Sequence, residues 1–137
     1  MTRGVAGMTM LEQLARHLAA RLRLPFEGDA EGAVFFGMLP EAPLRAVAVV
    51  AADLRAGDDG EGSQVRILVR SDGDGAWPLE RAAEILRLLD GARDLLLTPG
   101  GGVVHRVEAL RGFEFSGVDA AGAQVYAAEF RVVGCGE

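Results

Sequence analysis

Apolar residues recur along this chain with two different periods, and each period predicts one kind of element. Near the N-terminus an apolar stripe at helical spacing predicts an amphipathic helix over residues 10–23. The stripe consists of Leu11, Leu14, Ala15, Leu18 and Leu22. Thr9 and Glu12 have the spacing of a capping box at its start, and Pro25 stops the helical pattern.

A second stripe with the same period predicts a helix over residues 78–90. Its apolar side contains Leu79, Ala82, Ala83, Leu86 and Leu89. Pro78 falls in the first turn, where proline is tolerated, and Gly91 ends the pattern.

Five segments have the composition and alternation of strands, and they lie at residues 33–39, 44–54, 64–71, 103–115 and 123–133. The last two are joined by a loop of hairpin type, whereas "RDLLLTPGGG" reads as a short apolar segment and a turn. The order αβββαββ predicts an α+β fold in which both helices cover one face of a mostly antiparallel, five-stranded sheet. We expect a single domain over residues 10–133, with a flexible N-terminus at 1–9 and a C-terminal tail at 134–137.

The third strand, "QVRILVRS", carries charge in a regular alternation. Val65, Ile67 and Val69 alternate with Arg66, Leu68 and Arg70, so a period of two places the first set in the core and the second on the opposite face.

Three interpretations of that second face are open. In the first, Arg66 and Arg70 are solvent-exposed residues whose side chains also cover neighbouring apolar atoms. In the second, they form a protein–protein surface with Leu68 at its centre. The third interpretation is nucleic-acid contact, against which the acidic composition and the absence of interleaved aromatic residues argue.

Composition limits the classes of function. At 137 residues with half of them apolar, the chain has material for one core. Its net charge of −6 argues against a general binder of nucleic acid or anionic membrane. All fourteen basic residues are arginine, which we attribute to genomic base composition before any selection for guanidinium chemistry.

The single cysteine, Cys135, allows no internal disulfide, which fits a cytoplasmic product. The N-terminus lacks the apolar segment of a signal peptide, and the longest interior apolar run, residues 46–52, is far short of the ~20 residues that span a bilayer. We therefore expect neither standard export nor a membrane anchor.

Candidate chemistry is sparse. "TPGGGV" lacks the lysine and the following helix of a P-loop, and "SDGDG" lacks the later ligands of a calcium loop. His17, which lies off the apolar stripe, and His105 have no metal-ligand spacing, and Cys135 has no spaced partner. Asp58, Asp59 and Glu61 share a glycine-rich loop that suits solvation. We predict no catalytic residue, no cofactor and no metal.

The order of these elements resembles the minor capsid and tail-terminator family of long-tailed bacteriophages. The resemblance covers residues 10–133, and its most specific parts are "FFGMLPEAP" and "QVRILVRS". The last hairpin departs from relatives, because its turn reads "GVDAAGAQ" where a charged glycine turn followed by arginine is common.

The resemblance implies a structural virion protein that is assembled in the bacterial cytoplasm. Its relatives cap the tail tube as a ring, usually of six copies, and present a docking surface to the head connector. The partners implied are therefore further copies of itself, the tube protein and the head-completion protein, with no specific nucleic acid and no membrane. A ring needs two complementary surfaces per subunit. Our candidate pair is Arg66, Leu68 and Arg70 facing Asp58, Asp59 and Glu61.

Two other classes of function stay open. A monomeric binding module of the immunity or adaptor type fits the same composition, and it would bind one partner without self-assembly. A small enzyme ranks third, because it would need a pocket with perturbed titratable groups that the sequence does not reveal.

Overall fold

The structure is a computed structural model of the chain, and it describes residues 9–52, 63–73, 75–97, 101–120 and 122–134. Within these ranges, one helix and three strands are followed by a second helix and three more strands. They are α1 (Met10–Leu22), β1 (Ala33–Phe36), β2 (Ala46–Ala51), β3 (Ser63–Arg70), α2 (Ala76–Leu89), β4 (Arg93–Leu96), β5 (Val103–Val118) and β6 (Gln124–Gly134).

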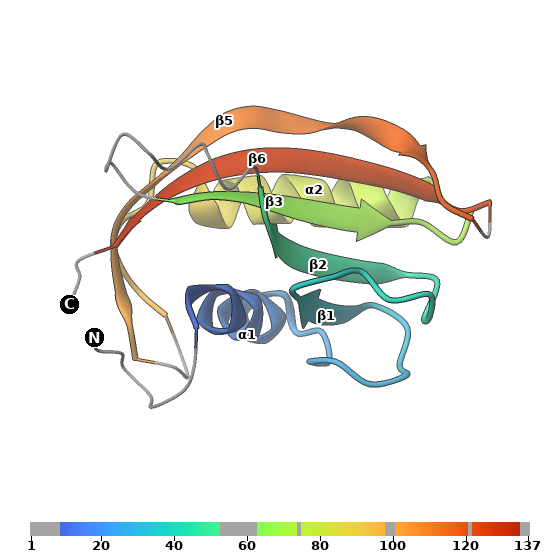
Figure 1. Cartoon of the computed structure of the whole chain (residues 1–137), viewed down its shortest axis with the longest axis horizontal. Coiled ribbons are helices and arrows are strands. Elements are labelled where there is room, and N and C mark those ends of the chain that lie inside the picture. Colours follow the sequence, from blue (N-terminus) through green and yellow to red (C-terminus); the bar gives the residue numbers. More distant parts are fainter. Residues whose placement is uncertain (1–8, 53–62, 74, 98–100, 121, 135–137) are drawn as a thin grey trace.

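The strands form one sheet in the order β1-β2-β3-β6-β5-β4. β1 and β2 are parallel, and each of the other neighbouring pairs is antiparallel. Figure 1 shows the sheet curling around the two helices, with the long β5–β6 hairpin along one side. The predicted α+β class is confirmed, whereas the expected count of five strands is wrong.

The structure differs from the predicted sheet in its sixth strand and in the parallel β1–β2 pair, and each difference has a structural cause. Three of the four residues of β4 are exposed, so this strand lacks the alternation that identifies a strand in sequence. It forms because it pairs with the start of β5 at the sheet edge. β1 and β2 were expected as consecutive strands of a mostly antiparallel sheet. The chain instead crosses back through residues 37–45 before β2 begins, so the two strands point the same way.

The helix ends differ slightly from the predicted ones. The hydroxyl of Thr9 accepts the N–H of Glu12 at 3.1 Å, as a capping box requires, but the Glu12 carboxylate pairs with Nε of Arg16 at 3.0 Å. Arg23 ends α1, because it adopts the left-handed conformation with φ of 60°. α2 begins two residues before Pro78, which keeps that proline within the first turn.

The core lies between the helices and the inner face of the sheet. α1 packs against β1 and β2, and α2 packs against β3 and β5. Side chains from both helices and three strands have no exposed surface there: Leu14, Leu18, Val47, Val49, Ile67, Ile85, Leu89 and Phe130. The predicted inner row of β3 is buried as expected, with Val65, Ile67 and Val69 at 2% exposure or less.

Candidate functional site

The outer face of the sheet, which turns away from the helices, carries the polar side chains of β3, β5 and β6. Residues that face each other across an antiparallel ladder share one side of the sheet. Arg66 of β3 faces Glu129 of β6, which in turn faces Arg111 of β5. Nη2 of Arg66 lies 2.9 Å from Oε2 of Glu129, so the strand arginine singled out from the sequence already has an ionic partner.

This face carries charges of both signs. In the next row Gln64 faces Arg131, which faces Glu108, and beyond Arg111 a bulge brings Glu114 onto the same face. The outer face of β3, β5 and β6 thus carries Arg66, Arg106, Arg111, Arg131, Glu108, Glu114 and Glu129. It is a mixed-charge surface. Sequence reasoning missed Arg111, Glu114 and Glu129, because only the strand order places them beside Arg66.

A shallow hollow of about 250 Å³ lies within this face. Its lining residues are Arg66, Arg111, Glu114, Phe115, Ser116, Ala127 and Glu129. The ring of Phe115 meets Tyr126 edge to face, with ring centroids 5.9 Å apart, and both residues share the side of the sheet that carries Val69, opposite to this face. Two guanidinium groups and two carboxylates around a hollow are compatible with a protein contact surface.

Arg70 has a different role from Arg66, although the two share the alternation. Only 2% of Arg70 is exposed. Its Nε donates to the carbonyl of Leu44 at 2.9 Å, its Nη2 donates to the carbonyl of Pro43, and its Nη1 lies 3.3 Å from the Asp119 carboxylate. The guanidinium therefore joins two connections within one chain. The expectation that Arg70 presents its charge at the surface is corrected, because residues 43–44 and 119 cover this end of β3.

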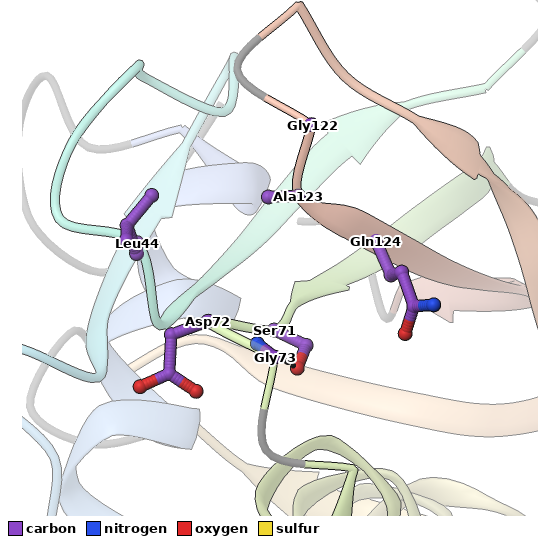
Figure 2. Close-up of a pocket in the computed structure, with 7 residues that line it drawn as sticks. All are labelled: Leu44, Ser71, Asp72, Gly73, Gly122, Ala123 and Gln124. Atoms are coloured by element: carbon purple, nitrogen blue, oxygen red, sulfur yellow. Dashed lines mark hydrogen bonds between the residues drawn. The ribbon is translucent and has the colours of Figure 1, made fainter.

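A polar pocket of about 250 Å³ lies near the same end of β3. Figure 2 shows its lining, which comes from three segments: Leu44 before β2, Ser71 to Gly73 after β3, and residues 122–124 at the start of β6. The one carboxylate in this lining, on Asp72, pairs with Nε of Arg45 at 3.0 Å. The Ser71 hydroxyl accepts the N–H of Gly73 at 3.0 Å. These polar groups are engaged in holding the loop, and we assign no chemistry to the pocket.

The histidines lie apart and in contrasting surroundings. His17 is 2% exposed although it lies off the apolar stripe, because α1 is covered beyond that stripe, where Gln13 is buried as well. Burial lowers the pKa of His17 below its ordinary 6.5, and the nearby Arg21 charge lowers this pKa further. His105 is exposed on β5, with Nδ1 3.5 Å from the Asp94 carboxylate.

Several predicted positions lie outside the described residues: Asp58, Asp59, Glu61 and Cys135. Across the ranges that the structure does describe, no group of three or more histidine, cysteine, aspartate or glutamate side chains is placed to hold a metal ion. In the same ranges, no helix has the length and apolar character to cross a membrane.

Comparison with known proteins gives one kind of match. No protein family matches the sequence, and no curated protein matches it either. Among solved structures, a chain in a structure titled "Virion of native gene transfer agent (GTA) particle" is similar, with a TM-score of 0.55 and 21% sequence identity. The alignment covers 95% of this chain and 98% of that chain. The likeness therefore concerns the fold of the whole chain.

Proposed function

We propose that this chain is a structural protein of a phage-like particle, and that it works as a subunit of a ring. The observation that carries the proposal is the fold similarity to a chain of a gene transfer agent virion, which extends over 95% of this chain and 98% of the other. The sequence resemblance to phage minor capsid and tail-terminator proteins supports the same assignment. In this role the chain contributes surfaces and not catalytic groups, and it resides in the virion.

The outer face supplies one of the two surfaces that a ring requires. A closed ring is built from head-to-tail contacts, so one patch of each subunit meets a different patch of the next. Arg66 and Leu68 lie on the outer face, beside the hollow lined by Arg111 and Glu129. Because this face carries charges of both signs, we propose that it selects a partner surface of mixed charge. Arg70 is left out of this contact, because its guanidinium is buried.

We further propose that the ring has about six subunits, closes the end of a tail tube and presents a docking surface to the head connector. Ring closure explains how one small domain stops tube growth without catalysis, since every subunit edge is used within the ring. Asp58, Asp59 and Glu61 stay candidates for the complementary surface of the neighbouring subunit.

Mass measurement by light scattering with negative-stain microscopy of the same sample tests this proposal. We expect rings of about six subunits, either free or on added tube ends. The variant Arg66→Glu with Leu68→Gln should abolish the rings while the protein stays folded by circular dichroism. Arg87→Glu, an exposed position on α2, is the matched charge control. A monomer that binds no tube end would overturn the proposal and favour a single-partner binding module.

A further inference from the structure

One strand of the sheet is longer than the neighbour that protects it. β5 has 16 residues, whereas β4 pairs only with its first part, from Val103 to Arg106. The next residues of β5 are hydrogen-bonded to the connection between α2 and β4. The N–H of Gly91 donates to the Val107 carbonyl at 3.0 Å, and the Asp90 carboxylate accepts the N–H of Ala109 at 2.9 Å. Past Ala109, no described residue outside β6 forms a backbone hydrogen bond with β5, so residues 110–117 form a free sheet edge.

This edge has bulges and two charged residues, Arg111 and Glu114, but it lacks two other features that discourage strand pairing. A free edge is a template for pairing with another chain, and lysine or proline normally discourages it. Residues 110–117 contain neither. The strand also exposes apolar side chains, with Leu110 at 39%, Phe115 at 56% and Val118 at 59% exposure. Exposed apolar groups on a free edge indicate a contact surface.

Bulges in this stretch place two opposite charges side by side. Arg111 faces Glu129 and Glu114 faces Ala127. Since Glu129 and Ala127 are alternate residues of β6, Arg111 and Glu114 share the outer face, about 7 Å apart along the strand. Within the described ranges the side chains of Arg111 and Glu114 have no ion-pair or hydrogen-bond partner, because Glu129 is engaged by Arg66.

We infer that the free edge of β5 binds the same edge of a second copy of this chain, antiparallel and about a twofold axis. In that arrangement Arg111 of each copy faces Glu114 of the other copy, so both unpartnered charges are matched twice. Leu110 precedes these charges along the strand and Phe115 follows them, with Phe115 on the opposite side of the sheet. The contact is self-complementary and closed, so it protects the edge without forming a filament.

The contact differs from the ring contact in symmetry and does not depend on the proposed function. A ring joins unlike patches, whereas this pair joins the same patch of two copies. Arg111 and Glu114 line the hollow that also contains Arg66, but Arg66 is paired within its own chain. Leu68→Gln, which keeps the Arg66–Glu129 ion pair in place, should therefore weaken the ring and leave the twofold pair intact.

Sedimentation of the full chain over a wide concentration range tests the inference. Two short strands bury little surface, so we expect a reversible dimer that weakens as salt is raised. Arg111→Glu or Glu114→Arg alone should weaken dimerisation roughly tenfold or more, because like charges then face each other twice. The double variant with both changes should recover the wild-type dissociation constant to within about threefold. Arg93→Glu is the control for Arg111→Glu, because it makes the same change in net charge at an exposed position on β4.

A mixing experiment separates charge pairing from loss of folding. Arg111→Glu and Glu114→Arg are each self-repelling, but together they form two attractive pairs, so a one-to-one mixture should give a heterodimer. Dimers in the mixture and in the double variant, with monomers in each single variant, support the inference. A wild-type chain that stays monomeric throughout overturns it. Self-association that is equally strong in both single variants also overturns it.

Discussion

Nη1 of Arg70 lies 3.3 Å from Oδ2 of Asp119, and this pair joins the end of β3 to the turn between β5 and β6. The same guanidinium donates to the carbonyls of Pro43 and Leu44. Asp119 in turn accepts the N–H of Ala123 through Oδ1, at 2.9 Å. One side chain thus holds the crossover before β2 and the hairpin turn in fixed positions.

Replacement of Arg70 by methionine should be strongly destabilising. It leaves two carbonyl groups and a carboxylate without their donor in a nearly buried site, which is expected to cost about 2–4 kcal/mol of unfolding free energy. Urea unfolding followed by circular dichroism measures this loss. Arg66→Met is the matched control, and it should cost less than about 1 kcal/mol because its ion pair is largely exposed. Equal losses in the two variants would contradict the role given to Arg70.

Asp119 and Arg70 should be energetically coupled. Asp119→Asn keeps an oxygen for the N–H of Ala123 but removes the charge that faces Arg70. A double-mutant cycle with Arg70→Met should give a coupling energy of about 1–2 kcal/mol. Strict additivity of the two losses would show that the pair contributes nothing, and that the two carbonyl acceptors alone fix Arg70.

His17 should make stability fall as the solution is acidified. Its folded-state pKa is lowered by burial and then by Arg21, so the unfolded chain binds the proton first as pH drops below 6.5. The unfolding free energy should therefore be fully present above this pH and decrease below it, with a slope of at most about 1.4 kcal/mol per pH unit from this group.

Urea unfolding between pH 5 and pH 7.5, on the order of six pH values, measures that slope. His17→Gln should flatten the profile in this range. His105→Gln, at an exposed position, is the control for replacing a histidine as such. A His17→Gln profile as steep as that of the wild type would rule out His17 as its source.

A side chain at Gly102 should force the Gln13 carboxamide to move. Its N–H donates to Oε1 of the buried Gln13 at 2.9 Å, and a Cβ at Gly102 would lie only 2.5 Å from that oxygen. Gly102→Ala is expected to cost about 1–3 kcal/mol by displacing the carboxamide. The loss should shrink in a Gln13→Ala background, which removes the obstacle. Gly112→Ala, where a Cβ meets open space, is the control for a general effect of alanine.

The sequence could predict those parts of the fold that depend on local periodicity. The inner row of β3, the α1 stripe and the final hairpin all follow from spacing within one segment, and each is present in the structure. The resemblance to phage proteins also came from the order of these segments. By contrast, β4 shows no clear alternation in sequence, because its place depends on pairing with β5.

The candidate site was predictable only in part. Alternation placed Arg66 and Arg70 on the same face, and it could not distinguish them. The structure leaves 43% of the Arg66 side chain exposed and buries Arg70 almost completely. The mixed charge of the outer face was also hidden, because Glu129 and Arg111 are far from Arg66 in sequence and become its neighbours only through the strand order.

The sequence by itself determined the two described helices, the strands other than β4, and which side of β3 faces the core, because these depend on the spacing of apolar residues within one segment. The tertiary structure alone decided the parallel pairing of β1 with β2, the burial of Arg70 beneath residues 43–44 and 119, and the free edge of β5. Those features depend on contacts between segments far apart in sequence, which no local period encodes.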